Sequence, residues 1–459
     1  MVFSYQSVTV PTDLDPLVAA TGLAASGLFS TYVVYEGPDA WSVAGGVVAE
    51  VVLKPDAIRC TKDGTVVERP WEGDPLAQVR EFLEGLEAAD WRAYGWSAFE
   101  LAYAVAGRPV GNEVLLHLIV PRTEIRLSRG QALVRGVDPK EMALVEKALA
   151  GLEAEPEAGH RPVEVDTAVG VAGYRASVAA VVDRIRAGEL QKAVVSRIVP
   201  VASDIDFPAS YLAGRRANTP ARSYLLDMGD LQAMGFSPET VVEVQADRTV
   251  ASQPLAGTRA LTGDADEDRR LREQLLTDPK ELHEHAISVK VAVDELAGPC
   301  KPETVVVQEY MVIKERGSVQ HLASRVVGRM PQEASPWDAF AAVFPAVTAS
   351  GVPKHAAYDA ISDCEPRARG LYAGTVMTVA QDGSMDAALA LRSVFRRHGE
   401  TWLQAGAGVV EHSVPEREVE ETMEKLRCVA GRLVARPTES GATARAGLEK
   451  DLLEKHPKV

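Results

Sequence analysis

The sequence predicts an α+β protein in which large, mostly antiparallel sheets are covered by helices. Between about residues 30 and 135, short apolar runs alternate with turn residues, a pattern typical of antiparallel strands. From about residue 170 to residue 436, hairpin-like strands are interspersed with segments whose apolar residues recur at helix spacing. This mixture favours layered sheets with helices packed on them.

In the first part of the chain, TKDGTVV (residues 61–67) places Asp-Gly between two strand-like runs and predicts a hairpin. Residues 74–90 have apolar residues at helix spacing and predict a helix among these strands. Residues 151–166, GLEAEPEAGHRPVEVD, are acidic, contain proline and show no periodicity, so we interpret them as a linker. We therefore divide the chain at residue 160.

In the second part, apolar residues from Tyr174 to Ile185 predict an amphipathic helix that ends at Gly188. The following QKAVVSRIVPV predicts a strand, and we expect one long helix from about residue 267 to residue 297. We assign residues 161–436 to a second region of strands and helices. Residues 437–459 form a polar tail that has little reason to pack.

Composition and charge exclude several classes of function. The chain has 459 residues, 46% of them hydrophobic, which is ample for a large core. Its formal net charge of -16 argues against a nucleic-acid or anionic-membrane partner. An anionic substrate would therefore need a local positive site within an acidic protein.

The cysteines and the N-terminus indicate a cytoplasmic protein. Cys60, Cys300, Cys364 and Cys428 are scattered without metal-ligand spacing, as expected for reduced thiols in the cytosol. The first residues, MVFSYQSVTVPTDLDP, have neither the basic nor the apolar region of a signal peptide. No apolar run approaches the length of a membrane span.

Two acidic pairs are the most informative feature of the sequence. Glu281 and Glu284, and likewise Glu418 and Glu421, are spaced i,i+3, so each pair projects from one helix face. Four carboxylates brought together would repel one another unless a hard cation lay between them, and oxygen ligands suit Mg²⁺. Lys425 follows Glu421 at i+4 and adds an ammonium group on the same side. The alternative is that each pair is an ordinary solvated helix face.

Lys192 and Glu239 are candidates for a general base and a general acid. Lys192 lies where a turn enters the strand KAVVSR, and a desolvated lysine there can lose its proton near neutral pH. Glu239 follows Ser-Pro, and in a partly apolar pocket its carboxyl could stay protonated. The alternatives are a strand-end lysine that points to water and a glutamate that caps an element.

Two segments of small residues, PLAGTRA (254–260) and QAGAGVV (404–410), predict loops whose N–H groups can approach an anion. Tight turns in a sheet explain them nearly as well. Neither matches a nucleotide-binding fingerprint, so we expect no nucleotide cofactor.

Three further residues are candidates for substrate contacts. Thr348 follows an apolar run, FPAV, which suggests a strand that ends in a polar loop. Arg392 lies within the strand-like run ALALRSVF and needs an anionic partner, either a substrate carboxylate or an internal Asp or Glu. Tyr372 in RGLYAG could be a second donor to that carboxylate.

Together these segments resemble the chorismate-utilising enzyme family, which includes anthranilate, aminodeoxychorismate, isochorismate and salicylate synthases. Within it, the chain is most similar to salicylate synthases of the mycobacterial and yersinial siderophore type. The similarity spans roughly residues 170–436 and is looser before that, through segments such as YGWSAFE. It is carried by QKAVVSR, SPETV, PLAGTRA, KELHEHAISV, ERGSVQHLASR, FPAVTASGVPK, RGLYAG, ALALRSVF, WLQAGAGVVE and PEREVEETMEKL.

The resemblance implies one large α+β unit with a central sandwich of two sheets, as in anthranilate synthase component I. Residues 1–160 would be the sheet-rich half of this fold, and residues 161–436 would bind chorismate with Mg²⁺. Lys192 would activate water for attack at C2 of the ring, and Glu239 would protonate the departing C4 hydroxyl. Glu284 and Glu421 would be the main metal ligands, with Glu281 and Glu418 holding metal-bound waters.

The remaining residues would bind the substrate. Tyr372, Arg392 and the Gly406–Gly408 segment would receive the pyruvyl carboxylate. The rest of the pocket would be lined by Gly257, Thr258, His321, Thr348 and Lys425.

The resemblance also ranks the reactions. Aminating members carry Gln at the position of Lys192, so lysine favours water as the nucleophile. The AVTASGVPK form around Thr348 is similar to that of salicylate synthases, which also eliminate pyruvate from isochorismate. Gln253 departs from the usual Glu of those enzymes.

We therefore expect a Mg²⁺-dependent salicylate synthase that acts as a monomer without an amidotransferase subunit. The alternatives are an isochorismate synthase, an aminating synthase with an amidotransferase partner, and a catalytically silent paralogue that binds chorismate. The pathway that uses the product is left open, whether siderophore or other secondary metabolism.

Overall fold

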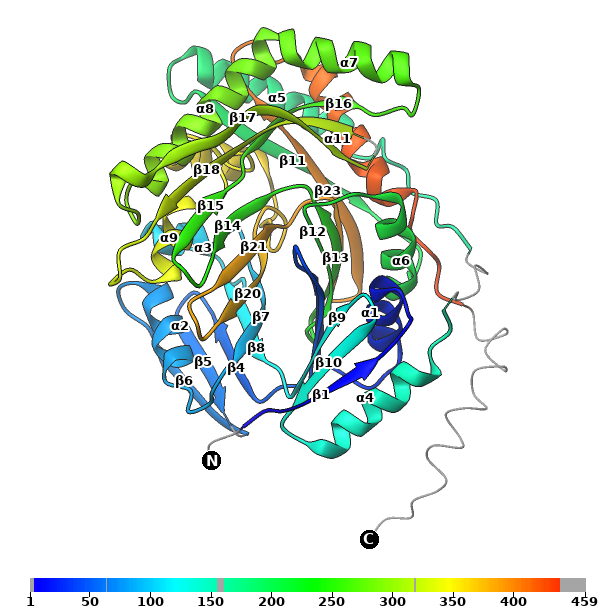
Figure 1. The fold of residues 1–459 in the computed structure, drawn as a ribbon. Helices are drawn as coiled ribbons and strands as arrows, with labels where there is room; N and C mark the ends of the chain where they lie inside the picture. Colours follow the sequence, from blue (N-terminus) through cyan, green and yellow to red (C-terminus); the bar gives the residue numbers. More distant parts are fainter. Residues whose placement is uncertain (1–3, 63, 155–160, 318, 438–459) are drawn as a thin grey trace.

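The computed structural model describes residues 4–62, 64–154, 161–317 and 319–437, and most of the predicted tail lies outside them. Within these residues the strands form two sheets, of 11 and 12 strands, with helices packed on them (Figure 1). Neighbouring strands are antiparallel, for example β2 with β12 and β7 with β20. The predicted α+β class is therefore confirmed.

The first sheet joins the strands that begin the chain to those that carry Lys192 and the 404–410 segment. In spatial order it contains β1 (Gln6–Pro11), β10 (Gln131–Gly136), β9 (Thr123–Ser128), β3 (Trp41–Gly45), β2 (Tyr32–Glu36), β12 (Arg222–Asp227), β13 (Leu231–Ser237), β22 (Ser393–Arg397), β23 (Glu400–Val409), β11 (Lys192–Pro200) and β19 (Gly351–Val352).

The second sheet is built in the same way from both halves of the chain. Its strands in order are β16 (Leu255–Ala260), β18 (Val319–Arg329), β15 (Thr249–Ser252), β14 (Thr240–Val244), β21 (Met385–Leu389), β20 (Thr375–Ala380), β7 (Arg92–Ser97), β8 (Leu116–Val120), β4 (Ala49–Leu53), β5 (Ala57–Lys62) and β6 (Thr65–Pro70), with β17 (Val306–Arg316) paired to β18.

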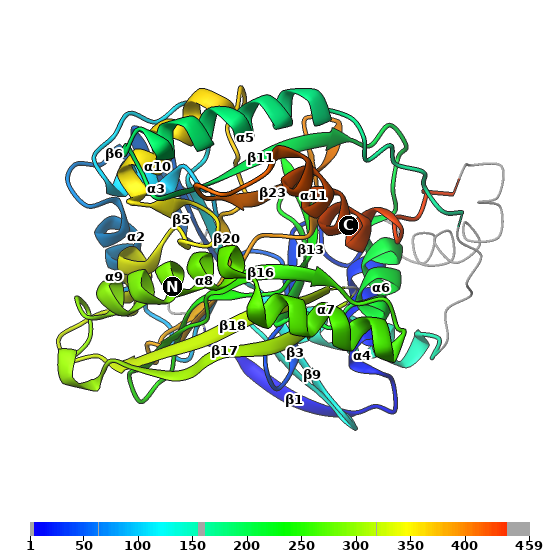
Figure 2. The same cartoon turned by 90° about the horizontal axis from the view of Figure 1, so that it is seen from above.

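Helices cover the outer faces of the sheets. They are α1 (Pro16–Ala25), α2 (Pro75–Glu84), α3 (Leu101–Val105), α4 (Pro139–Gly151), α5 (Val171–Arg186), α6 (Phe207–Ala217), α7 (Ala265–Thr277), α8 (Pro279–Leu296), α9 (Pro336–Val343), α10 (Lys354–Cys364) and α11 (Pro415–Ala430), with a 3₁₀ turn at Pro302–Thr304. Seen from above, α8 lies beside β16 and α11 beside β23 (Figure 2).

The largest hydrophobic cluster joins the two sheets. Tyr35 and Ala44 from the first sheet are buried in one cluster with Tyr94, Trp96 and Val376 from the second. A second cluster packs helices such as α1, α4 and α6 on the first sheet. A third cluster packs α5 and α10 against β11, and it fixes the strand on which Lys192 lies.

Several predicted elements are confirmed. The Asp-Gly segment joins β5 to β6 as a hairpin, and the 74–90 segment contains α2. The Tyr174–Ile185 pattern lies in α5, with Tyr174 and Val178 buried. QKAVVSRIVPV contains β11.

The single long helix predicted for residues 267–297 is wrong, because two helices, α7 and α8, meet at Asp278. The Asp278 carboxylate accepts hydrogen bonds from the N–H groups of Lys280 and Glu281 and so caps α8. Pro279 at the first position of α8 has no N–H to continue a preceding helix. The break sets the direction in which α8 carries Glu281 and Glu284.

Residues 344–347 do not form the predicted strand. They run as a loop from the end of α9 to the two-residue strand β19. None of the helices in the described ranges is long and apolar enough to cross a membrane.

Candidate active site

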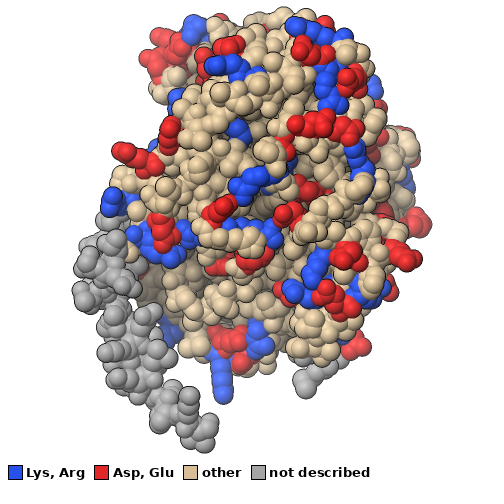
Figure 3. All heavy atoms as spheres, turned by 180° about the vertical axis from the view of Figure 1, so that it is seen from behind, with Lys and Arg blue, Asp and Glu red and all other residues tan. Residues whose placement is uncertain are grey.

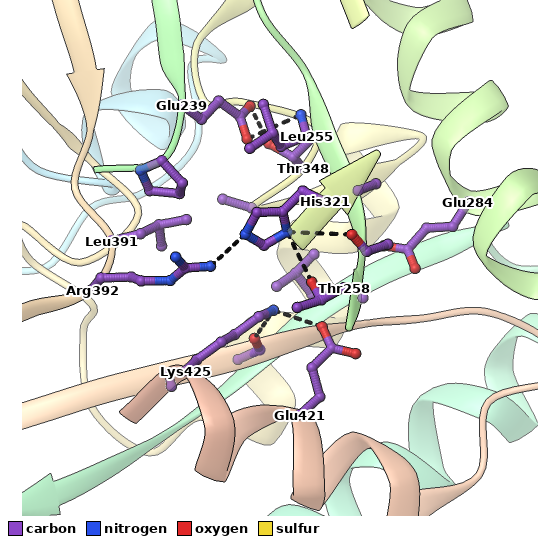
Figure 4. Close-up of a pocket in the computed structure, with 18 of the residues that line it drawn as sticks. Glu239, Leu255, Thr258, Glu284, His321, Thr348, Leu391, Arg392, Glu421 and Lys425 are labelled. Carbon is purple, nitrogen blue, oxygen red and sulfur yellow. Dashed lines mark hydrogen bonds and ion pairs between the residues drawn. The ribbon is translucent and has the colours of Figure 1, made fainter. Parts of the chain in front are cut away.

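The predicted site residues converge on one pocket between the two sheets (Figure 4). The cavity has a volume of about 70 Å³. Every predicted site residue lines it except Lys192, Glu281 and Glu418. Lys192 pairs with the lining residue Glu284, whereas Glu281 and Glu418 pair with Lys280, which in turn contacts Glu284. Gln253 is not among the lining residues.

Lys192 is the first residue of β11 and its side chain is fully buried. Its Nζ lies 3.1 Å from Glu284 Oε1 and donates a 3.1 Å hydrogen bond to Ser288 Oγ. Both partners lie on α8, one turn apart. The alternative of a strand-end lysine that points to water is therefore wrong.

Glu239 lines the cavity and is also buried (Figure 4). Thr348 Oγ1 donates a 2.6 Å hydrogen bond to Glu239 Oε1, and the N–H of Leu255 donates to Oε2 at 3.3 Å. Burial raises the pKa of the Glu239 carboxyl to about 8, although these two hydrogen bonds favour the charged form. Glu239 is thus a carboxylic acid that retains its proton at neutral pH.

The two acidic pairs lie on α8 and α11 and face each other around the ammonium group of Lys280. Lys280 Nζ is 3.1 Å from Glu284, 3.5 Å from Glu418 and 3.7 Å from Glu281. Glu281, Glu284 and Glu418 are 5%, 6% and 2% exposed, so the reading of solvated helix faces is wrong. Among the described residues, no three acidic, His or Cys side chains are arranged to hold a metal as they stand, because Lys280 lies between them.

The donor set nevertheless fits a hard cation. Oε2 of Glu281 and Oε2 of Glu418 are buried, and neither has a hydrogen-bond partner in the described part of the chain. A buried carboxylate oxygen without a partner is costly, and a divalent cation with oxygen ligands would satisfy it. These glutamates are therefore the residues of this site that could hold a metal ion.

The charges within each pair are divided unequally. Although burial opposes ionisation, Lys192 and Lys280 lower the pKa of Glu284 to about 2. Lys425 and Lys280 likewise lower the pKa of Glu421 against the effect of burial. Burial raises the pKa of Glu418 to about 7 and also raises that of Glu281. One glutamate of each pair therefore carries most of the negative charge.

Lys425 brings a positive charge to the pocket from α11. Its Nζ is 2.7 Å from Glu421 Oε1 and donates to the carbonyl oxygen of Gly406 at 2.9 Å. The predicted i,i+4 pair is therefore present, and the ammonium group lies beside β23 at the pocket wall (Figure 4).

Arg392 is a buried cation without a carboxylate partner in the described ranges. Its NH2 group donates to His321 Nε2 at 2.7 Å, and its Nε has no partner among these residues. An internal Asp or Glu partner is therefore excluded there. Arg392 has a φ of 51° in the turn before β22, a strained backbone conformation of the kind that is frequent at functional sites.

His321 is held as a neutral ring beside Arg392. Burial, Arg392 and Lys425 hold its pKa well below the usual value. Because a guanidinium can only donate, Nε2 of His321 is the acceptor and Nδ1 carries the proton. Nδ1 lies 3.3 Å from the carbonyl oxygen of Gly257 and 3.1 Å from Thr258 Oγ1. These contacts leave the positive charge of Arg392 available to an anion in the pocket.

The two segments of small residues lie in strands β16 and β23, so the prediction of loops is wrong. Their glycines are required by close neighbours. A Cβ on Gly408 would lie 2.0 Å from Glu284 Oε1, and one on Gly406 would lie 2.5 Å from the Val195 carbonyl oxygen. Gly257 has a φ of 82° at a register shift between β16 and β18. Tyr372, 2% exposed, places its hydroxyl against Gly406.

The pocket is therefore a positive site for an anion with an acidic wall beyond it. Arg392 and Lys425 face the cavity on one side, and the protonated Glu239 faces it on another. On the molecular face seen from behind, acidic and basic side chains are interspersed, without an extended basic surface (Figure 3). This arrangement suits a small anion that exchanges protons with a buried acid and a buried base.

Sequence reasoning missed Lys280 and Ser288. Lys280 precedes Glu284 by four residues on α8, as Glu421 precedes Lys425 on α11. This i,i+4 spacing was a signal that Lys280 would lie among the carboxylates. Ser288 carried no signal, because its contact with Lys192 joins residues 96 positions apart.

Comparison with known proteins identifies the family. Residues 30–431 match the family model of the chorismate binding enzymes. The chain is 39% identical over 437 residues to a salicylate synthase of Mycolicibacterium paratuberculosis, covering 94% of this chain and 96% of that protein. It is 32% identical over 410 residues to anthranilate synthase component 1 of Pseudomonas aeruginosa, covering 81% and 82%.

Two solved structures share the fold. Anthranilate synthase component I from Streptococcus pneumoniae has a TM-score of 0.73 at 24% identity, over 86% of this chain and 92% of that one. The menaquinone-specific isochorismate synthase from Escherichia coli has a TM-score of 0.71 at 22% identity, over 94% and 95%.

The fold and the pocket define an enzyme that acts on a small molecule. The chain belongs to the chorismate binding enzyme family, and the expected family and its two-sheet fold are confirmed.

The raised pKa of Glu239 makes stability depend on pH in a defined direction. Below pH 4.5, the ordinary pKa of a glutamate side chain, the carboxyl is protonated in both the folded and unfolded states. Between 4.5 and about 8 only the unfolded chain releases the proton, so this group lowers the free energy of unfolding as pH rises. Glu239→Gln stays neutral, so we expect its stability relative to wild type to increase across this window, by on the order of a few kcal/mol.

Urea unfolding of both proteins at pH 5 and pH 9 measures this change. A difference between Glu239→Gln and wild type that is the same at both pH values would contradict a protonated Glu239. The lost hydrogen-bond geometry of the variant contributes equally at both pH values and cancels.

Proposed function

We propose that the chain is a salicylate synthase that converts chorismate through isochorismate to salicylate and pyruvate, with Mg²⁺ as cofactor. The observation that carries the proposal is one pocket lined by a protonated Glu239 and by Glu284, the carboxylate that contacts the fully buried Lys192. The 39% identity over almost the whole length of a salicylate synthase supports the same reaction.

In the first step a hydroxyl group is exchanged between two ring carbons. Lys192 takes a proton from a water molecule, whose oxygen then bonds to C2 of the ring. Both ring double bonds shift, from C1=C2 to C1=C6 and from C5=C6 to C4=C5, as the C4–oxygen bond breaks. Glu239 gives its proton to the departing C4 hydroxyl, which leaves as water, so the step is an isomerisation overall. Thr348, which donates to Glu239 Oε1, holds this carboxyl in place.

Mg²⁺ would be held by Glu284 and Glu421, the two glutamates with lowered pKa, with Glu281 and Glu418 on bound waters. When bound, it supplies positive charge that neutralises the ring carboxylate of the substrate. Lys280 then has to leave the space between the acidic pairs, since its ammonium group lies among the same oxygens.

In the second step isochorismate loses pyruvate. The C2 proton of the ring passes to the enolpyruvyl methylene carbon as the C3–oxygen bond breaks, which yields salicylate and pyruvate. No separate acid or base is needed, so the pocket acts by holding the enolpyruvyl arm in a reactive pose. Arg392, Tyr372 and Gly406 are placed to receive the pyruvyl carboxylate.

An isochorismate synthase that releases its product is the second candidate. It uses the same base and acid and differs only in whether the second step follows. An aminating synthase is disfavoured by Lys192, because ammonia needs no base to remove a proton before it attacks. We accordingly propose a cytoplasmic monomer that needs no amidotransferase subunit.

The direct test is to incubate the purified protein with chorismate and Mg²⁺, without ammonia, and to separate the products by chromatography. We expect salicylate and pyruvate in equal amounts, with both lost after addition of EDTA. Isochorismate alone would replace the proposal with the second candidate. Product that forms only after ammonia is added would assign an aminating synthase, and no conversion at all would contradict an active enzyme.

Lys192→Gln tests the base. We expect turnover to fall by at least about 10²-fold, within the usual range for a lost general base, while Mg²⁺-dependent chorismate binding measured by calorimetry persists. Binding is the control, because it shows that the pocket is intact. Turnover near the wild-type rate would contradict the role of Lys192.

A further inference from the structure

We propose that Glu365 and Arg369 are positioning residues that lock β11, which carries Lys192, to the loop that carries Thr348. The loop comprises residues 344–350 and is called the Thr348 loop below. The inference rests on the proposed function, since Lys192 and Thr348 matter through the chemistry assigned to them. It adds two residues that line neither the metal site nor the substrate pocket.

The first observation is that only one edge of β11 is paired along nearly its full length. On that edge β23 pairs with residues 193–200. On the other edge β19 pairs only with Lys192 and Ala193, and the Val194 N–H then donates to the Ser350 carbonyl at 2.7 Å. Beyond this point no strand from the described part of the chain covers the edge, so its peptide groups need other partners.

Glu365 and Arg369 supply these partners. Arg369 NH2 donates to the carbonyl oxygen of Val194 at 2.6 Å, and the N–H of Ser196 donates to Glu365 Oε1 at 2.8 Å. Residues 194 and 196 are spaced i,i+2, so their peptide groups point to the same edge of β11. The ion pair therefore continues the sheet in place of a strand.

Arg369 also reaches the Thr348 loop. Its NH1 group donates to the Ala349 carbonyl oxygen at 2.8 Å, next to Thr348 in the chain. One guanidinium thus ties the strand of the base to the residue that holds the acid Glu239. It also lies 5.7 Å from the ring centroid of Tyr372, which lines the pocket.

The Glu365–Arg369 pair is held in place by a residue from the first half of the chain. Glu100, in the YGWSAFE segment, accepts hydrogen bonds from the backbone N–H groups of Arg369 at 2.7 Å and Gly370 at 3.0 Å. The neighbouring Phe99 ring lies 4.5 Å from the Arg369 guanidinium carbon. This contact gives YGWSAFE a role that reaches the active site although it lies outside the pocket.

The burial of the pair argues against a role in stability alone. The side chains of Arg369 and Glu365 are 2% and 6% exposed, and they bond to each other at 2.5 and 3.0 Å. A buried ion pair is seldom more stabilising than apolar residues of the same volume, because both charges lose their hydration. What apolar residues could not supply is the directional contact with the peptide groups of Val194, Ser196 and Ala349.

The test compares Arg369→Lys with Arg222→Lys as a matched control. Arg222 is also buried and pairs with Glu243 at 2.9 Å and Asp386 at 2.7 Å, but it does not line the pocket. A lysine cannot donate to both Val194 and Ala349 with the planar geometry of arginine. We expect the kcat of Arg369→Lys on chorismate to fall by about 10²-fold with KM changed less than threefold, since misplacement by about 1 Å can cost that factor.

Arg222→Lys should keep kcat and KM within about twofold of wild type, even if its Tm falls as much as that of Arg369→Lys. The reason is that Arg222 and its partners Glu243 and Asp386 do not line the pocket. Should Arg369→Lys fail to fold, the isosteric Glu365→Gln takes its place, with the same expected split between kcat and KM. Unchanged kcat in a folded Arg369→Lys or Glu365→Gln, or an equal loss of kcat in Arg222→Lys, overturns the inference.

Hydrogen exchange separates this inference from the proposed reaction. We expect backbone amides of residues 193–196 and 346–352 to exchange at least tenfold faster in Arg369→Lys and not in Arg222→Lys. This readout needs no substrate, so it decides the positioning role even if wild type does not convert chorismate. Exchange that is unchanged in both segments overturns the inference.

Discussion

The site depends on the contact between the Lys280 ammonium group and the two acidic pairs. Glu281, Glu284 and Glu418 are buried around it, and carboxylates at such distances repel unless a positive charge lies between them. Burial lowers the pKa of Lys280, but the surrounding glutamates together raise it more, so its pKa lies well above the usual value and the group stays charged. A cation between α8 and α11 is thus a condition for the folded site.

The contacts of the Lys280 cluster extend to the rest of the pocket. Glu284 is shared between Lys280 and Lys192, so the same carboxylate belongs to the acidic cluster and to the surroundings of Lys192. Gly408 has no side chain because Glu284 occupies the space that a Cβ would need. On the far side, where no cation pairs with it, burial alone keeps Glu239 protonated. The difference in pKa between Glu284 and Glu239 gives two buried glutamates different charges at neutral pH, as the proposed metal ligand and the proposed acid require.

Local patterns allowed much of the fold and the site to be predicted. The i,i+3 spacing placed both glutamates of each pair on one helix face, and the Asp-Gly hairpin followed from turn chemistry. The break at Asp278 was also local and was missed, although Asp-Pro is a helix-start signal. The 404–410 segment could not be placed from local rules, because Gly408 is required by Glu284 on α8 and Gly406 by the Val195 carbonyl on β11. Both neighbours lie more than 100 residues earlier in the chain.

The partners of buried charged side chains also could not be predicted from local sequence patterns. Arg392 suggested a strand from its apolar neighbours, whereas its backbone has a φ of 51° and its side chain meets His321. Peptide groups at the edge of β11 bond to Glu365 and Arg369, neither of which the sequence analysis singled out. Such contacts join residues far apart in the chain and follow from the completed topology.

The measurement that tests the central claim most directly is anomalous diffraction from crystals grown with and without Mn²⁺, which takes the same oxygen ligands as Mg²⁺. The account predicts a peak between Glu284 and Glu421, with the Lys280 side chain withdrawn from the carboxylates. Without Mn²⁺, Lys280 should lie among them, 3.1 Å from Glu284. A Lys280 that remains between the acidic pairs at millimolar Mn²⁺, with no metal there, would contradict the account.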